Sequence, residues 1–214
     1  MKNQLPKLPA QLQTVEDFPA LLRQVSIEES DIIAAQIKDA VLNETDLSKL
    51  CFKEVLFENC KFTGCLFVQA DLMNVVFQSC DLSNCNFSDG YFKNCRFIAC
   101  KGVGLDLQSI SMQQADFANC NFKYSNWDNA KLKAVTISES DFSRANITSC
   151  KLTQLALSEV QFIGTSFFKT PLNGVDFTQC SIDGMIVSGE ELRGAVVNAY
   201  QASELAKLLG LIIK

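Results

Sequence analysis

Apolar residues recur at every fifth position along most of this chain. In the series that runs from Ile27 to Val197, 34 of 35 positions are apolar, and only Gly102 interrupts it. An α-helix repeats about every 3.6 residues and a β-strand about every 2, so a period of five fits neither an amphipathic helix nor an alternating strand. Such internal repetition is typical of solenoid proteins, in which each short unit packs against its neighbours.

Small residues form a second series, two positions before each large one. Most of its members are no larger than valine, for example Ala70, Cys80 and Ala115. Aspartate often lies between the two series, as Asp71 does between Ala70 and Leu72. Small side chains leave space that large neighbours can fill, and protein interiors reach their high density in this way.

The resulting pattern, A(D/N)LXX with leucine or phenylalanine at the centre, resembles the pentapeptide-repeat family over about four fifths of the chain. The resemblance implies an all-β fold, a right-handed quadrilateral β-helix in which four pentapeptides form one square coil. It also implies that the large and small series point inward and that the other three positions face solvent. Each coil would pair its backbone with the coils on either side.

The repeat divides the chain into three parts. We expect the pentapeptide-repeat β-helix to span residues 26–197, after an N-terminal cap in residues 1–25 and before a C-terminal helix and tail in residues 198–214. Residues 14–17 contain a possible helix start. An open β-helix end exposes unpaired backbone groups and apolar core, so both flanks are expected to act as caps.

The C-terminal flank also supplies a candidate dimer surface. Its sequence predicts a short helix that ends at Gly210, followed by an apolar strand in residues 211–213. A simple cap and a dimer contact are equally compatible with its apolar side chains. The candidate dimer residues are Tyr200, Leu205, Leu208, Leu209, Leu211 and Ile212.

A narrower resemblance covers residues 192–210, which look like the C-terminus of the Qnr quinolone-resistance proteins. The sequence Tyr-Gln-Ala-Ser from Tyr200 to Ser203 carries it. The resemblance implies a homodimer that binds DNA gyrase and topoisomerase IV, mimics duplex DNA and protects these enzymes from quinolones. The alternative is a structural or adaptor rod that binds another protein without any effect on topoisomerases, because a fold does not fix a function.

Acidic residues fall unevenly on the four faces of the predicted coil, where positions that differ by 20 share a face. Two opposite faces are the most acidic, which suits a partner with a basic groove. The alternative is that these carboxylates only keep the protein soluble. One face would carry Asp46, Asp89, Asp106 and Asp128, and the opposite face Glu58, Asp116, Glu139, Glu159 and Asp176.

Composition argues against several other classes of protein. The formal net charge of −5 disfavours direct binding of nucleic acid through its phosphates. The chain has no histidine and no glycine-rich phosphate loop, so we predict no catalytic residues, no cofactor and no enzyme activity. We find neither a signal peptide nor an apolar run of about 18 residues, and we expect a cytoplasmic protein with no membrane partner.

Nine of the ten cysteines follow the five-residue period rather than a metal-binding motif, and only Cys51 lies outside it. The spacings among these nine are multiples of five, without the C-x2-C spacing of zinc sites, so no metal site is predicted. In the cytosol they are expected to remain reduced and to pack as small hydrophobic side chains. Cysteines 20 positions apart should stack on one interior face, so their geometry does not exclude disulfide bonds. The cysteines in the small series are those at 60, 65, 80, 85, 95, 100, 120, 150 and 180.

Overall fold

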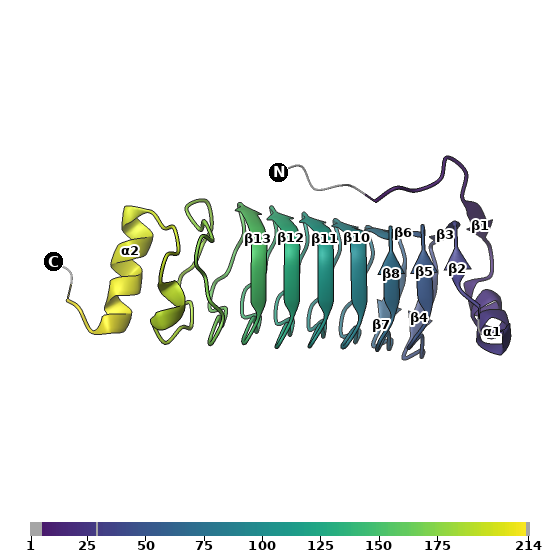
Figure 1. Cartoon of the computed structure of the whole chain (residues 1–214). Coiled ribbons are helices and arrows are strands. Elements are labelled where there is room, and N and C mark those ends of the chain that lie inside the picture. Colours follow the sequence, from purple (N-terminus) through teal and green to yellow (C-terminus); the bar gives the residue numbers. More distant parts are fainter. Residues whose placement is uncertain (1–5, 29, 213–214) are drawn as a thin grey trace.

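In the computed structural model, which describes residues 6–28 and 30–212, the chain winds into a rod of stacked coils with a helix at each end (Figure 1). Strands in neighbouring coils are parallel and pair with residues 20 positions further along, as Phe97 does with Phe117. The main sheet therefore runs along the rod, in the order β1-β3-β6-β9-β10-β11-β12-β13.

Most strands are short, and the longest lie in the middle of the rod. The strands are β1 (Gln13–Val15), β2 (Ile32–Ile33), β3 (Ala35–Lys38), β4 (Val41–Asn43), β5 (Cys51–Lys53), β6 (Leu56–Glu58), β7 (Lys61–Thr63), β8 (Asp71–Met73), β9 (Val76–Gln78), β10 (Tyr91–Ile98), β11 (Ser111–Ala118), β12 (Lys131–Ser138) and β13 (Lys151–Ser158). The helices are α1 (Phe18–Glu28), α2 (Ala199–Ala206) and the short 3-10 helices η1 (Glu190–Leu192) and η2 (Lys207–Leu209).

A left-handed residue turns the chain two positions after most of the large residues. These residues have positive φ angles whether they are asparagine, as at Asn59 (53°), glutamate, as at Glu139 (47°), or glycine, as at Gly104 (70°). The strain at non-glycine residues is offset by hydrogen bonds between coils, such as that from the N–H of Asn59 to the carbonyl of Gln78 at 3.0 Å. One such turn in every pentapeptide gives the coil its four corners.

The large and small series both point into the rod, as predicted. Phe57, Phe77, Phe97 and Phe117 stack along one side of the core, with ring centroids 4.7, 5.0 and 4.8 Å apart. The rings are nearly parallel because each residue occupies the same position in successive coils. The predicted β-helix is thereby confirmed, and its core is one continuous column.

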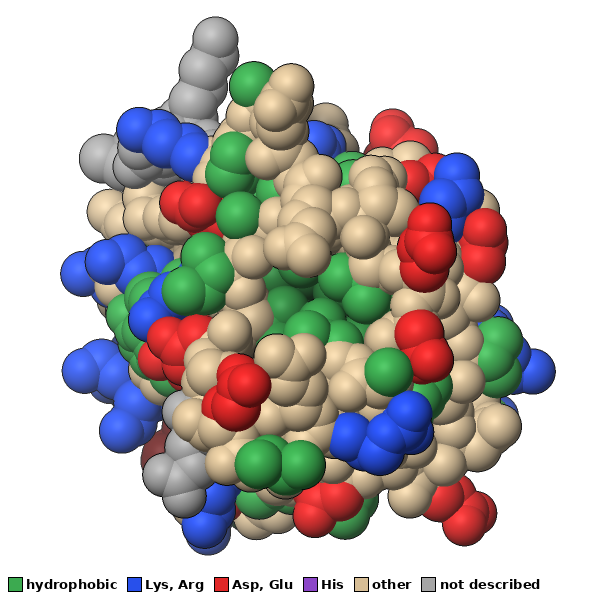
Figure 2. Space-filling view, turned by 90° about the vertical axis from the view of Figure 1, so that its right-hand side faces the viewer, with side chains coloured by type: hydrophobic (Ala, Val, Ile, Leu, Met, Phe, Trp, Pro, Cys, Tyr) green, Lys and Arg blue, Asp and Glu red, His purple; other side chains and the backbone are tan. Residues whose placement is uncertain are grey.

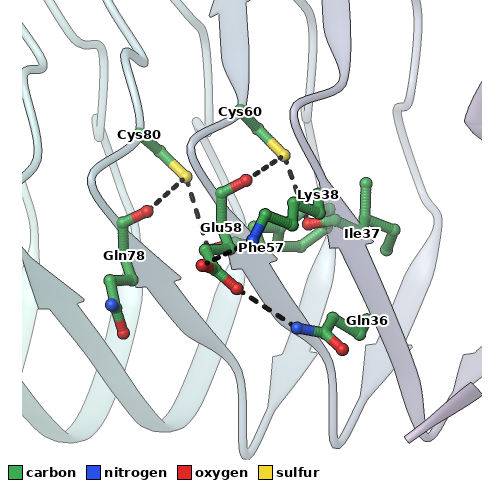
Figure 3. A network of polar contacts seen from close by, with 8 residues as sticks. All are labelled: Gln36, Ile37, Lys38, Phe57, Glu58, Cys60, Gln78 and Cys80. Carbon is green, nitrogen blue, oxygen red and sulfur yellow. Dashed lines mark hydrogen bonds and ion pairs between the residues drawn. The ribbon is translucent and has the colours of Figure 1, made fainter. Parts of the chain in front are cut away.

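The cysteines are free thiols, and most of them are buried. The sulfur of Cys60 donates to the carbonyl of Ile37 at 3.4 Å and that of Cys80 to the carbonyl of Phe57 at 3.5 Å (Figure 3). Burial raises the pKa of Cys95 to about 12, so this thiol is un-ionised at neutral pH. These cysteines pack as small, weakly donating core side chains.

The N-terminal cap differs from the predicted boundaries. Helix α1 continues beyond residue 25 to Glu28, and Ile27, expected to be the first large core residue, is 83% exposed on this helix. The helix buries Phe18 and Val25 instead, two residues seven positions apart, so helical periodicity overrides the five-residue repeat here. Residue 14 lies in β1 rather than at the helix start, and the carboxylate of Asp17 accepts the N–H of Ala20 at 2.8 Å.

This cap does not close the end of the rod completely. Phe18 enters the core, where its ring centroid lies 6.1 Å from that of Phe57. Beside it, a hollow of about 530 Å³ is bordered by Val15, Leu21 and Ile32. Figure 2 looks onto this end and shows hydrophobic side chains at its centre, surrounded by polar atoms.

Candidate partner-binding faces and dimer surface

The predicted acidic residues lie on two opposite sides of the coil. Ladders of bridged residues 20 positions apart define these sides, one of them through Asp106 and Asn126 and the other through Arg96 and Asp116. The two ladders are separated by two pentapeptides, which is half of one coil. We call the side with Asp46, Asp89, Asp106 and Asp128 the first acidic face, and the side with Glu58, Asp116, Glu139, Glu159 and Asp176 the second acidic face.

On the first acidic face, a ladder of side-chain hydrogen bonds runs from the carboxylate of Asp106 through the amides of Asn126 and Asn146. The Oδ1 of Asp106 accepts the N–H of Gln108 at 3.1 Å and the Nδ2 of Asn126 at 3.0 Å. The Oδ1 of Asn126 in turn accepts the Nδ2 of Asn146 at 2.9 Å. Asp106 is half-buried, and these hydrogen bonds hold its carboxylate against the coil.

The other carboxylates of this face differ in how much they expose. Asp128 is half-buried and accepts the hydroxyl of Thr148 at 2.7 Å. Asp46 is exposed, and hydrogen bonds from Ser48 hold its pKa below the usual value. Asp89 is exposed at a left-handed corner with φ 58°. Asp46 and Asp89 are thus the two carboxylates of this face that are open to solvent.

On the second acidic face, two carboxylates are paired with basic residues of neighbouring coils. Glu58 lies 3.2 Å from the Nζ of Lys38 and also accepts the Nε2 of Gln36 at 3.1 Å, as Figure 3 shows. Asp116 lies 2.8 Å from the Nε of Arg96. These two carboxylates add little net negative charge to the face, because each is neutralised by its partner.

The remaining carboxylates of the second face are exposed. Glu139 and Glu159 follow Ser138 and Ser158, which are register partners in β12 and β13, so both occupy the same corner in successive coils. Asp176 accepts the N–H of Thr178 at 2.9 Å, and hydrogen bonds from Thr178 lower its pKa. Glu139 and Glu159 form the most prominent carboxylate pair of the candidate site.

At the C-terminal end, Gln201 attaches helix α2 to the last coil. Its Nε2 donates to the carbonyls of Phe177 and Cys180, both at 2.8 Å, and the side chain is 4% exposed. Asn198 caps the helix by accepting the N–H of Gln201 at 2.9 Å, and Oε1 of Gln201 accepts the N–H of Asn198 at 2.9 Å. Glutamine side chains are mostly exposed in proteins, so the role of Gln201 as an anchor could not be predicted from the sequence.

The predicted dimer residues are not all equivalent. Tyr200, Leu208, Leu211 and Ile212 are exposed, with Ile212 at 88%. Leu205 instead packs against the core of the last coil, which makes it part of the cap. The side chain of Leu209 lies outside the described residues.

The end of the chain also departs from the predicted strand. Gly210 ends the helical segment in the left-handed conformation, with φ 76°, as expected. Leu211 and Ile212 are not in a strand, and residue 213 lies outside the described part of the chain. A hollow of about 800 Å³ beside α2 is lined by Val187, Leu192, Val197, Leu205 and Leu208 among others, so α2 covers the last coil incompletely.

Comparison with known proteins agrees with this geometry. Residues 70–147 match the family model described as a pentapeptide repeat region. The fold is a pentapeptide-repeat β-helix. No curated protein matches the chain.

Two of the solved structures that resemble this β-helix are of QnrB1, described as a plasmid-mediated fluoroquinolone resistance protein. A trypsin-treated variant is 21% identical, with a TM-score of 0.53, and the match covers 84% of this chain and 100% of that one. Full-length QnrB1 is 20% identical, with a TM-score of 0.48, and the match covers 83% of this chain and 91% of that one.

Two further observations concern the described part of the β-helix. Nowhere in it do three or more histidine, cysteine, aspartate or glutamate side chains gather as a metal site requires. Neither helix there combines the length and apolar content that crossing a bilayer requires.

Proposed function

We propose that this β-helix is a non-enzymatic protein that binds DNA gyrase or topoisomerase IV and protects the enzyme from quinolones. The observation that carries the proposal is a straight rod with exposed carboxylates on two opposite faces, among them the stacked pair Glu139 and Glu159. A rod of this form suits a basic groove that ordinarily holds duplex DNA. The likeness of its fold to QnrB1 agrees with this assignment.

Shape has to contribute more than total charge to such mimicry. Duplex DNA presents about one negative charge per 1.7 Å. Successive coils are spaced by about 4.8 Å, and Glu58 and Asp116 are neutralised by ion pairs. The exposed carboxylates therefore serve mainly to steer the rod towards a positively charged groove.

We further propose that the protein forms a homodimer through its C-terminal end. Tyr200, Leu208, Leu211 and Ile212 expose apolar surface there, next to a last coil that α2 does not fully cover. Burying these side chains against a second copy would remove apolar surface from water on both subunits.

Gyrase supercoiling assays in the presence of ciprofloxacin test the proposed function. We expect the protein to restore supercoiling, and E139Q/E159Q to weaken that protection several-fold by removing two steering charges. The matched control is E44Q/E54Q, because Glu44 and Glu54 occupy the same kind of left-handed corner on the other two faces. Failure to restore supercoiling at any protein concentration, together with no detectable binding to gyrase, would reject the proposal.

The ion pairs of Glu58 and Asp116 favour a second candidate, an adaptor rod that binds another protein and leaves topoisomerases unaffected. Carboxylates that form ion pairs between coils stabilise the rod instead of imitating phosphates. No binding to gyrase and no drug protection, together with a different protein that the rod retains in a pull-down, would support this second candidate.

A further inference from the structure

The first halves of β10, β11, β12 and β13 form a basic surface between the two acidic faces. The four strands lie side by side in the sheet (Figure 1). Each of them bends at a left-handed residue, as β12 does at Ala134 with φ 54°, and only the part before the bend belongs to this surface. We call it the basic face and define it as residues 91–93, 111–113, 131–133 and 151–153, which include four lysines and neither aspartate nor glutamate.

Two of these lysines are direct neighbours across the sheet. Lys131 in β12 is the register partner of Lys151 in β13. Neighbouring strands lie about 4.8 Å apart, and like charges directly opposite each other destabilise a sheet. Lys133 follows two positions after Lys131 and lies on the same side of β12, and all three lysines are exposed. The basic face thus concentrates three positive charges in a small area at a cost in stability.

The same strands pair opposite charges on their second halves. There Arg96 of β10 lies 2.8 Å from Asp116 of β11. None of the ion pairs within the described part of the chain includes Lys131, Lys133 or Lys151. Local choices that lower stability are expected mainly at functional sites. In a chain with a formal net charge of −5, this cluster therefore indicates a surface that binds an anion.

A shallow hollow of about 230 Å³ lies among these lysines. Pockets that hold a whole drug-sized ligand usually measure about 300–1,000 Å³, so this hollow suits one chemical group of a ligand. Uncharged hydrogen-bond donors border it as well as ammonium groups, which favours an anion with several oxygens. The polar side chains at its border are those of Tyr91, Ser111, Gln113, Lys131, Lys133, Lys151 and Thr153.

A phosphate monoester fits this set of donors better than a carboxylate or a phosphodiester. At neutral pH it carries a charge of about −1.5 to −2 and three strong acceptor oxygens. It can therefore offset the repulsion between Lys131 and Lys151 and still accept hydrogen bonds from nearby hydroxyls. Lysine binds phosphate as a point charge. A carboxylate and a phosphodiester each carry a single charge, and duplex nucleic acid would also meet the acidic faces on both sides of the basic face.

We propose that the hollow on the basic face binds a doubly charged phosphate group, either of a phosphomonoester or of free phosphate. Lys131 and Lys151 approach the group from neighbouring coils, and Lys133 contributes the third positive charge. The hydroxyls of Ser111 and Thr153 donate to its oxygens. This site uses none of the carboxylates of the two acidic faces, so it does not depend on binding to a topoisomerase.

Titration of the full chain with phenyl phosphate, followed by phosphorus NMR, tests the proposal. We expect saturable binding that weakens with salt. Dimethyl phosphate is the matched ligand with one charge, and it should bind at least about tenfold more weakly. Inorganic phosphate distinguishes the two sources of the group. Binding as tight as that of phenyl phosphate assigns the site to free phosphate, and weaker binding assigns it to an ester.

Variants of the protein locate the site. K131Q/K151Q should weaken the binding of phenyl phosphate about tenfold. The control K49Q/K61Q removes exposed lysines of other faces and should leave binding unchanged. Amide signals should shift on addition of the ligand mainly in the residues of the basic face. Circular dichroism confirms that each variant is folded.

A readout without ligand tests the like-charge contact on which the inference rests. K151Q should raise the thermal midpoint of the ligand-free protein at low salt by about 1–3 °C, because it relieves the repulsion with Lys131. K61Q, at the same pentapeptide position on another face, should not raise it. Equal midpoints of K151Q and K61Q would contradict the repulsion.

Several outcomes of the binding experiments would overturn the proposal. These are equal affinity for dimethyl phosphate, unchanged affinity of K131Q/K151Q, or amide shifts confined to residues outside the basic face. Tighter binding of an oligothymidylate than of phenyl phosphate, lost in K131Q/K151Q, would make the face a nucleic-acid surface instead. No saturable binding of either phenyl phosphate or inorganic phosphate would reject the proposal outright.

Discussion

Gly102 and Phe122 share the space of one aromatic ring, because a Cβ atom at position 102 would lie 2.6 Å from both Cδ1 and Cε1 of Phe122. The glycine that interrupts the large series is therefore compensated from the next coil. Leu105 and Ile110 are fully buried nearby. Core packing therefore accounts for the interruption of the large series at Gly102.

Gly102→Ala is expected to destabilise the fold by about 1–3 kcal/mol, because it overpacks the core against Phe122. The free energy of unfolding can be measured by urea titration with the fluorescence of Trp127, the single tryptophan, as the probe. Adding Phe122→Leu should recover part of the loss. Additive effects of the two substitutions would contradict the shared space.

Phe77→Ala is expected to cost about 3–5 kcal/mol, since it opens a cavity within the phenylalanine stack. Phe77 lies between Phe57 and Phe97, at centroid distances of 4.7 and 5.0 Å. The control is Phe168→Ala, because Phe168 is 43% exposed and lies outside the large series. Urea titrations of both variants give the comparison, and equal losses would contradict the buried stack.

Stability should fall in acid through the carboxylate of Glu191. Burial alone would raise the pKa of Glu191, but the N–H groups of Lys169 and Ser188 and the Ser188 hydroxyl outweigh it and lower the pKa to about 2. The ordinary value is 4.5. A lowered pKa in the folded state stabilises the protein fully above the unfolded value, and this contribution is lost as the pH falls from 4.5 towards 2.

Unfolding midpoints measured between pH 2 and 7 test this prediction. Glu191→Gln should lower the midpoint at pH 7 and flatten the profile below pH 4.5, because glutamine does not titrate. Ser188→Ala should retain the acid dependence in reduced form, since the backbone donors to Glu191 remain. Profiles that run parallel for the original protein and Glu191→Gln would show that other carboxylates cause the acid loss.

Two substitutions in α2 separate its role as a cap from its role in a dimer. Gln201→Ala removes the anchor to Phe177 and Cys180 and should destabilise the C-terminal end by about 1–3 kcal/mol, because the carbonyls of these two residues each lose a hydrogen bond from the buried amide. Y200S/L208S alters only exposed apolar residues and should leave the thermal midpoint of the monomer within a few degrees.

Sedimentation distinguishes the alternatives for this end of the rod. A dimer that becomes monomeric in Y200S/L208S supports the proposed interface. A protein that is monomeric at every concentration, with Gln201→Ala still destabilising, shows that α2 acts only as a cap.

The sequence was sufficient for the fold because the five-residue period is a direct record of which side chains are inside. Phe57, Phe77 and Phe97 could be placed in one column once the resemblance to the pentapeptide-repeat family supplied the square coil, since residues 20 positions apart stack in such a coil. The same spacing assigned Glu139 and Glu159 to one face. At Ile27 the five-residue repeat predicts a core position, whereas the helical spacing of Phe18 and Val25 places those two side chains in the core instead. The sequence alone could not show which of the two patterns applies there.

What the sequence by itself determined is therefore the inward or outward direction of each side chain and the face on which it lies. Only the tertiary structure decided which carboxylates are neutralised, as Glu58 is by Lys38, and which remain exposed. It also decided that Gln201 is an anchor and that the main sheet ends at β13. These features depend on distances between side chains of different coils and on which strands pair, and a one-dimensional period contains no information about either.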